Sequence, residues 1–427
     1  MSDFSDNGLQ ELVRQLLVRQ SETRNLDYKE AISFDTSKKE KGEVLKDIIA
    51  MSNTRDGGYL LVGVEQHGGK FKPVGITSQQ AKSFDPTNIG QFAKNYCSLL
   101  PVVGAQVVEI DGVELLLLRV DEFDSEPIVC TKDLHGDKND LVLRAGSIYV
   151  RTTDARSLAI DSGESMRAFL DLAVQKRGDA LLTQVRGLVG GPVIFGASDP
   201  SDAYQEEIDS AERFFVDNLI DVQNSWYFEV FPKDYDGDRQ SAARLKEIRR
   251  ESVVILRGWD FPHVDRVYDQ IFDDGIQSLT HWERFHEAHR VYRSGLFTWR
   301  SQPHEDIDDG TENSLSIVSS IYSITEFFIF SSRYASLMVD SGDIVMRVGI
   351  AGLNGRALTS GPEMRYHQYQ TAATRFNRSY STSIEELRSS YLDLASDATR
   401  RLFDLYGFDA RPELIRYWQE KLVDRRF

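Results

Sequence analysis

Cysteine is scarce in this chain of 427 residues, which contains only Cys97 and Cys130. Two cysteines rule out a disulfide framework and a zinc site built from four thiolates. They also favour a reducing compartment. No cysteine stands out as a nucleophile with a neighbouring histidine, and the sequence has neither a P-loop nor a G-x-S-x-G elbow. These absences argue against an enzyme with a cysteine nucleophile, a P-loop nucleotide-binding enzyme and an enzyme with a serine nucleophile elbow.

Long hydrophobic runs and a basic leader are also missing. The first residues, MSDFSDNGLQELV, contain neither a basic n-region nor an apolar h-region, so we expect no signal peptide. The apolar runs, such as Leu115 to Leu118, are too short for a membrane-spanning helix. The sequence therefore predicts a cytoplasmic protein with no membrane partner.

An excess of positive charge is absent as well. The net charge is −17 at pH 7, and neither the part up to residue 175 nor the remainder is basic. Because proteins that bind nucleic acid over a broad surface are normally basic, binding here would need a local basic strip. Apolar residues are plentiful, at 41% of the chain with 23 Phe and 17 Tyr, which is enough for the cores of two or three domains.

The N-terminal part mixes helical and strand patterns. Apolar residues recurring at i, i+3 and i+4 indicate amphipathic helices, and β-rich runs broken by glycine turns indicate strands. The predicted elements are helices over 9–20, 42–51, 86–99 and 165–176, strands over 26–34 and 59–64, hairpins turned at 66–70 and 111–112, and a strand–turn–strand unit over 141–151. Together they predict a domain over residues 1–178 with a mixed β-sheet.

The character of the chain changes after residue 178. Residues 187–202 are rich in Gly, Pro, Ser and Asp, which predicts a linker over 179–202. The rest, 203–427, predicts an α-rich mixed α/β domain for sensing, interaction or oligomerisation, so the whole chain belongs to the α+β class. Its predicted elements are helices over 203–219, 239–252, 314–338 and 383–406, a last helix opening at Pro412, and a strand over 226–232.

Three histidines in this second domain do not predict a metal site. His281, His286 and His289 fall in the segment THWERFHEAHR, for which we expect a helix. Their spacing departs from H-E-x-x-H, in which two histidines four residues apart share one helix face. Ordinary polar roles are the simpler interpretation.

The stretch from Ser21 to Glu65 carries the main candidate site. Asp27 and Lys29 are two residues apart on a predicted strand, so their side chains lie on the same face. Glu65 ends a buried strand, and Glu22 precedes Asp27 by five residues. Three carboxylates and a lysine in one pocket would suit a divalent cation and a phosphodiester. The plain alternative is a set of exposed carboxylates in an acidic protein.

A set of basic residues accompanies these carboxylates. Lysines and arginines can position nucleic acid by contacting its phosphates. The candidates for such contacts are Lys38, Lys39, Lys41, Lys46, Arg144, Arg151 and Arg156. Glu40 and Glu43 interleave the lysines, so a solvated charged face is the alternative.

Several pieces of this region occur in an order that resembles the AlbA-like domain of the Schlafen family. They are Glu22, the segment LDYKE over 26–30, AMSNT over 50–54, GGYLLVGVE over 57–65, and RAGSIYVRTTDARSLA over 144–159. The resemblance extends over about residues 9–175. It implies a Schlafen-type mixed β-sheet lobe.

The resemblance also implies a function. In nucleolytic Schlafen proteins two glutamates and an aspartate form a metal-dependent RNA-cleaving site, and their positions fall on Glu22, Asp27 and Glu65. At the second position this chain has Asp27 where the family has Glu, and at the third it has Glu65 where the family has Asp. We therefore expect Mg²⁺ or Mn²⁺ at these three residues, with Lys29 as a further catalytic residue and a tRNA-like RNA as substrate. The zinc site of animal members is not expected.

Other implications follow from the same resemblance. Animal members fold two such lobes into a clamp, and this chain has one, so a homodimer or larger homo-oligomer is expected to rebuild it. A role in bacterial stress or antiphage defence would fit an endoribonuclease. Two alternatives stay open: a non-catalytic, DNA-binding transcriptional regulator, and a structural subunit that binds no nucleic acid.

Overall fold

The computed structural model describes residues 3–177 and 200–424, with gaps at 125, 138, 164, 168, 175, 219, 266–267, 283–284, 307–312 and 360–368. The chain forms two compact units, one of residues 1–184 with the segment 255–259, the other of 185–254 with 260–426. The part of the expected linker up to residue 199 lies outside the described residues. Both units combine helices with sheets, which confirms the α+β class.

The N-terminal unit is built on a four-stranded sheet in the order β1-β2-β6-β5. Its strands are β1 (Leu26–Lys29), β2 (Gly58–Val62), β5 (Val103–Ile110) and β6 (Val113–Val120). β1 and β2 are parallel, whereas β6 is antiparallel to both of its neighbours. A parallel pair needs a crossover connection, and α2 (Lys38–Ser52) provides it. The hairpin predicted at Asp111-Gly112 joins β5 and β6 and is confirmed.

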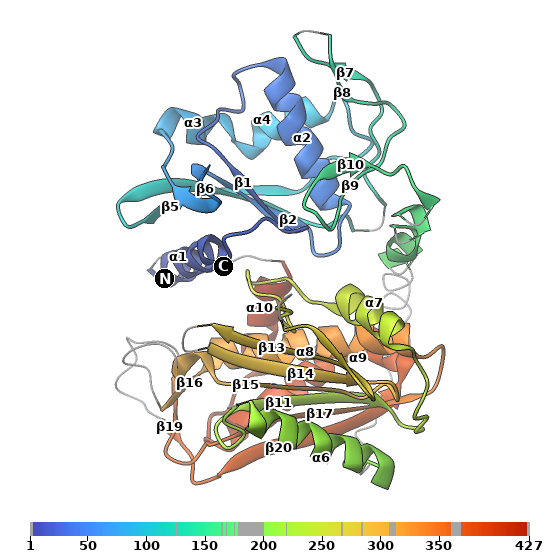
Figure 1. Cartoon of the computed structure of the whole chain (residues 1–427). Helices are drawn as coiled ribbons and strands as arrows, with labels where there is room; N and C mark the ends of the chain where they lie inside the picture. Colours follow the sequence, from blue (N-terminus) through green and yellow to red (C-terminus); the bar gives the residue numbers. More distant parts are fainter. Residues whose placement is uncertain are drawn as a thin grey trace. The chain divides into compact units, whose positions relative to one another are not determined.

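Helices cover both faces of this sheet (Figure 1). Leu61 packs with Leu12 of α1 (Asp3–Val18) on one face, and Leu60 packs with Ile48 of α2 on the other. Successive side chains of a strand point to opposite faces, which explains this division. On β1, Tyr28 belongs to the α1 side. Asp27 and Lys29 consequently face α2.

Smaller elements complete the unit. They are β3 (Val64–His67), β4 (Lys70–Pro73), α3 (Ser78–Ser83), α4 (Pro86–Ala93), β7 (Leu134–His135), β8 (Leu141–Leu143), β9 (Tyr149–Arg151) and β10 (Ser157–Ala159). β3 and β4 form the hairpin expected at 66–70, and β9 pairs with β10.

The predicted strand over 59–64 is interrupted at Gly63, which is a correction with consequences for the site. Gly63 has a φ of +98°, a region that L side chains rarely adopt. Its N–H donates to Lys29 O at 2.9 Å, and its carbonyl accepts from Val74 N–H at 2.7 Å. The chain leaves the main sheet there, so Glu65 lies on β3, in a different sheet from Asp27.

The second unit contains a seven-stranded antiparallel sheet in the order β12-β13-β14-β15-β11-β17-β20. Its strands are β11 (Trp226–Pro232), β12 (Gln270–Phe272), β13 (Gly275–Trp282), β14 (Phe285–Tyr292), β15 (Phe297–Ser301), β17 (Asp343–Ala351) and β20 (Arg375–Ser383). The short strands β16 (Ser314–Ser316), β18 (Ala357–Thr359) and β19 (Tyr369–Gln370) form a separate small sheet.

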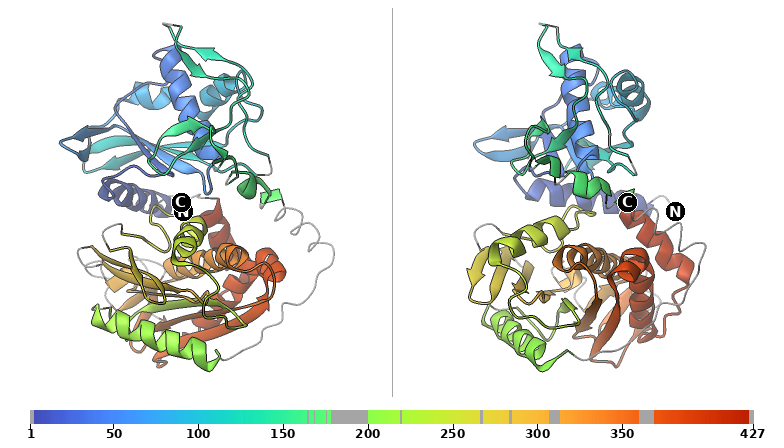
Figure 2. Two further views of the ribbon diagram at one scale, coloured as in Figure 1. Left: turned by 45° about the vertical axis from the view of Figure 1, so that its right-hand side comes forward. Right: turned by 90° about the vertical axis from the view of Figure 1, so that its right-hand side faces the viewer.

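Five α-helices among the described residues accompany this sheet (Figure 2): α6 (Asp202–Asp217), α7 (Ala242–Ser252), α8 (Ile317–Met338), α9 (Ile384–Asp404) and α10 (Pro412–Val423). Tyr204 of α6 packs on Phe231 from one face, with ring centroids 4.6 Å apart. Phe327 of α8 stacks on Phe228 from the other face, also at 4.6 Å. In the described part of the chain no helix is long and apolar enough to cross a membrane.

The helix expected around the three histidines is wrong, because this segment forms two neighbouring strands. His281 on β13 lies directly opposite His286 on β14. His289 lies further along β14, is fully buried, and contacts Arg249 at 3.2 Å. Burial, with Arg249 and His263 nearby, lowers the pKa of His289 well below its ordinary value, so it is a neutral core residue.

Candidate functional site

Four charged side chains, three buried and one partly exposed, form a cluster in the N-terminal unit. Lys29 Nζ lies 2.8 Å from Asp27 Oδ2 and 2.7 Å from Asp47 Oδ2. Arg151 Nη2 lies 3.1 Å from Asp27 Oδ1, and its Nη1 lies 3.9 Å from Asp47 Oδ1. Asp27, Asp47 and Arg151 are only 4%, 7% and 3% exposed. We call these four residues the charge quartet.

Three elements bring the charge quartet together. β1 supplies Asp27 and Lys29, α2 supplies Asp47, and β9 supplies Arg151. The backbone N–H of Arg151 donates to Thr54 Oγ1 at 3.2 Å, which ties β9 to the chain just after α2. Its guanidinium also donates to the carbonyl of Thr23 at 3.2 Å, beside β1. The site is therefore a junction between strand, helix and strand.

Charge balance keeps Lys29 protonated. Burial disfavours its charged form, but Asp47 and Asp27 outweigh burial and raise the pKa of Lys29. Two carboxylates face two cations, so the quartet is neutral as a whole. The Lys29 side chain is 27% exposed, so its ammonium can stabilise negative charge on a phosphoryl group that approaches from solvent.

Glu22 joins the edge of the quartet. It is half-buried, and its Oε1 accepts from Tyr28 N–H at 3.2 Å. Burial first, and the neighbouring Asp27 charge second, raise the pKa of Glu22. The structure thus brings together Glu22, Asp27 and Lys29, as the sequence predicted.

Glu65 does not join them. Its Oε2 contacts His67 Nε2 at 2.8 Å on the β3–β4 hairpin. In the described ranges, no group of three or more acidic, histidine or cysteine side chains is arranged to hold a metal ion. The expected set of Glu22, Asp27 and Glu65 is therefore not assembled, because the turn at Gly63 carries Glu65 into another sheet.

Asp47 is the acidic residue that sequence reasoning missed. It sits among buried residues of α2, next to Ile48 and two residues after Leu45. A carboxylate within an otherwise apolar helix stripe is unusual unless a cation meets it. That anomaly was the available signal, but the sequence offered no way to choose its partner.

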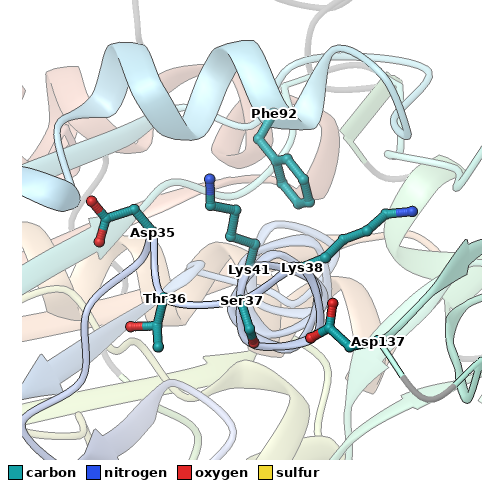
Figure 3. A pocket seen from close by; sticks show the side chains of 7 residues that line it. All are labelled: Asp35, Thr36, Ser37, Lys38, Lys41, Phe92 and Asp137. Carbon is teal, nitrogen blue, oxygen red and sulfur yellow. The ribbon is translucent and has the colours of Figure 1, made fainter.

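A pocket of about 480 Å³ opens at the first turn of α2. It is lined by Asp35, Thr36, Ser37, Lys38, Lys41, Phe92 and Asp137. Figure 3 shows the Lys41 side chain extending from α2 toward Phe92 of α4. Lys41 Nζ lies 5.9 Å from the Phe92 ring centre and 5.8 Å from that of Phe34.

The predicted phosphate-binding residues divide into two groups. Lys39 pairs with Asp140 at 2.7 Å, Lys46 pairs with Glu43, Arg156 pairs with Asp154 at 2.7 Å, and Arg151 is buried in the quartet. Among the residues that the structure describes, Lys38, Lys41 and Arg144 have no carboxylate partner within 4.0 Å. Arg151 is a correction: it holds Asp27 and Asp47 instead of lining an open groove.

Comparison with known families identifies this region. The family model described as Schlafen, AlbA_2 matches residues 22–158. These residues form a Schlafen AlbA-like domain. The match includes β1, α2, β2 and β9, and so all four members of the charge quartet. It supports a nucleic-acid-related role for the domain.

Two solved structures are similar to parts of the chain. The N-terminal domain of an ATP-dependent DNA helicase RecG-related protein from Nitrosomonas europaea is 25% identical, with a TM-score of 0.22; the similarity covers 29% of this chain and 80% of that one. The DIP2311 protein from Corynebacterium diphtheriae is 16% identical, with a TM-score of 0.23, over 48% of this chain and 34% of that one. A comparison with curated proteins gave no match. The Schlafen AlbA-like assignment rests on the family model.

Proposed function

We propose that the Schlafen AlbA-like domain is an endoribonuclease that cleaves structured, tRNA-like RNA. The observation that carries the proposal is the grouping of Glu22 and Asp27 beside a charged Lys29. Two neighbouring carboxylates can position an attacking water, and the ammonium can stabilise charge that develops on the phosphate. A role in bacterial stress or antiphage defence, and a homodimer that pairs two lobes, stay predictions.

The residues present fit a divalent cation held by two carboxylates. Mg²⁺ is commonly bound through one or two carboxylates together with substrate phosphates. Lys29 and Arg151 each occupy one oxygen of Asp27, and a carboxylate offers about four lone-pair sites. Glu22 and Asp27 would therefore hold Mg²⁺ or Mn²⁺, with RNA completing the coordination. The bound cation would lower the pKa of water and neutralise phosphate charge.

The pocket at the start of α2 would hold the RNA beside the cleavage site. Lys38 and Lys41 offer unpaired ammonium groups to phosphates, and Phe92 offers a ring face to a base. Asp35 and Asp137 also line the pocket, so we place the phosphate at the two ammonium groups. Lys38 and Asp47 are nine residues apart on α2, which is about 14 Å of axial rise.

The test is incubation of the purified full chain with total tRNA and Mn²⁺. We expect discrete cleavage products from the wild type, none in EDTA, and a large loss for Asp27→Asn. An absence of products, or equal cleavage by Asp27→Asn, would overturn the endoribonuclease proposal. Folding of the variant is checked by circular dichroism.

A second candidate is a non-catalytic DNA-binding regulator. It is favoured by the neutrality of the charge quartet, in which each carboxylate already faces two cations and needs no metal. This function predicts salt-dependent binding to duplex DNA that persists in EDTA and in Asp27→Asn. Retained duplex affinity without RNA cleavage would favour it over the nuclease.

The unpaired lysines should matter more for RNA affinity than the paired ones. We expect Lys38→Ala with Lys41→Ala to weaken RNA binding about tenfold at moderate salt and to reduce the slope of log K against log salt by up to about 2. The matched control is Lys39→Ala with Lys46→Ala, which removes the same formal charge from α2. Because Asp140 and Glu43 already neutralise that charge, the control should change affinity less than threefold. Equal losses in both double variants would contradict the role of the pocket.

A further inference from the structure

The two cysteines of the chain lie directly opposite each other in the N-terminal unit. Cys97 and Cys130 form an isolated antiparallel β-bridge, and both are free thiols. Ser98 N–H donates to Val129 O at 2.8 Å, and Thr131 N–H donates to Tyr96 O at 2.7 Å. These two hydrogen bonds flank the cysteines, so Cys97 and Cys130 form a non-hydrogen-bonded pair.

Such a pair has the spacing that a disulfide needs. In a non-hydrogen-bonded antiparallel pair the Cα atoms are about 4.5 Å apart and the side chains lie on the same face. Disulfides span Cα separations of about 4.4–6.8 Å. Both cysteines also belong to one apolar cluster with Ile128 and Tyr149. Neither thiol therefore has to leave the core to reach the other.

The bridge joins segments that support the candidate site. Cys97 follows α4, whose Phe92 lines the pocket. On the other side, Ile128 N–H donates to Asn53 Oδ1 at 2.9 Å, and the Asn53 amide donates to Tyr149 O at 3.0 Å. Tyr149 begins β9, which ends at Arg151. A covalent link at the bridge would tie the pocket wall to the strand that carries Arg151.

We propose that Cys97 and Cys130 are an oxidation site that forms a reversible intramolecular disulfide with hydrogen peroxide. Cys97 is 8% exposed and Cys130 is fully buried, so Cys97 reacts first. Its thiolate attacks one peroxide oxygen, which gives a sulfenic acid and releases hydroxide. The sulfur of Cys130 then attacks the sulfenic sulfur, an S–S bond forms and water leaves. Two thiols lose two electrons, and one peroxide is reduced to two waters.

Burial makes this oxidation slow at neutral pH. It raises the pKa of Cys97 to about 12 and also raises the pKa of Cys130, whose thiol donates to Lys132 O at 3.3 Å. Because the thiolate is the nucleophile, the rate should rise about tenfold for each pH unit between 7 and 9. In the denatured chain the rate should level off near the ordinary thiol pKa of about 8.5. The site therefore responds to sustained oxidation.

The experiment treats the full-length protein with hydrogen peroxide at pH 7, 8 and 9. Thiols are counted after unfolding, and the protein is digested with trypsin. We expect the count to fall from two to none, and peptides 95–119 and 120–132 to stay joined until a reductant is added. The melting temperature of the N-terminal unit should rise by roughly 5 °C or more and return on reduction.

Controls separate this site from general oxidation. Cys97→Ser keeps Cys130 and should give no joined peptides and no reversible rise in melting temperature. Peptide mapping excludes methionine oxidation, which adds mass elsewhere. Two thiols that persist at pH 9, sulfinic acid in place of a link, or covalent dimers instead of the intramolecular bond would each overturn the proposal. None of these readouts depends on RNA cleavage, so the outcome is independent of the proposed function.

Discussion

Replacing Arg151 by methionine is expected to lower the free energy of unfolding of the N-terminal unit by about 3–5 kcal/mol. The guanidinium holds Asp27 at 3.1 Å and reaches the carbonyls of Thr23 and Leu26. Methionine fills part of the volume but leaves two buried carboxylates with Lys29 as their remaining cation. An uncompensated buried charge costs more than the lost hydrogen bonds. Chemical denaturation with hydrogen exchange of peptides from β1, α2 and β9 measures the change.

Two further variants test this explanation. Arg156→Met is the matched control, because Arg156 is 65% exposed and pairs with an exposed Asp154. It should change stability by less than about 1 kcal/mol. Adding Asp27→Asn to Arg151→Met should recover part of the loss, because it removes the unpaired charge. If the double variant is less stable than Arg151→Met, or if Arg156→Met is equally damaging, the quartet is not what Arg151 stabilises.

The sequence predicted the framework of the site because that framework is local. The strand period of two places Asp27 and Lys29 on one face, and the apolar period of α2 places a helix over that face. Both follow from neighbouring residues alone. The position of Glu65 did not follow, because it depends on the turn at Gly63 and on its hydrogen bonds to Lys29 and Val74.

The partners of Asp27 were the least predictable feature. Arg151 lies 124 residues away, and exposed arginines greatly outnumber buried ones, so the sequence grouped it with phosphate-binding cations. Asp47 was not predicted to belong to the site, because a helical pattern indicates which residues are buried but not which side chains they contact. Long-range ion pairs are decided by tertiary packing, and a single sequence carries no direct record of it.

The second unit shows a different kind of failure. The segment around His281 and His289 was expected to be a helix, but it forms β13 and β14. Both faces of the sheet are covered, and Glu287 and His289 are buried, so the polar and apolar alternation of a half-exposed strand is missing. By contrast, the strand predicted over 226–232 is confirmed with the same bounds as β11, because its aromatic run WYFEVF is strongly β-rich.

Replacing Glu22 by glutamine is expected to reduce RNA cleavage at least about 100-fold, whereas Glu65→Gln should retain at least about a third of the activity. Glu22 lies beside Asp27 and would supply one of two carboxylates to the cation. Glu65 faces His67 on the β3–β4 hairpin and is outside this group. The family resemblance alone predicts equal losses for the two variants. Initial rates on tRNA with increasing Mn²⁺ distinguish these expectations.

Stability decides whether the Glu22 effect is chemical. Burial and the nearby Asp27 charge already disfavour the ionised form of Glu22, since both raise its pKa. A neutral glutamine keeps an acceptor for Tyr28 N–H and removes that repulsion, so thermal stability should be unchanged or slightly higher. The advantage of glutamine should grow as the pH rises from the ordinary carboxyl pKa to the raised pKa of Glu22 in the folded protein, and should then level off, because both states of the wild type are ionised above that point. Loss of cleavage with intact stability assigns Glu22 to the reaction, while a parallel loss of both makes it structural.

If Glu65→Gln is as inactive as Glu22→Gln, the hairpin must bring Glu65 to the metal when RNA binds.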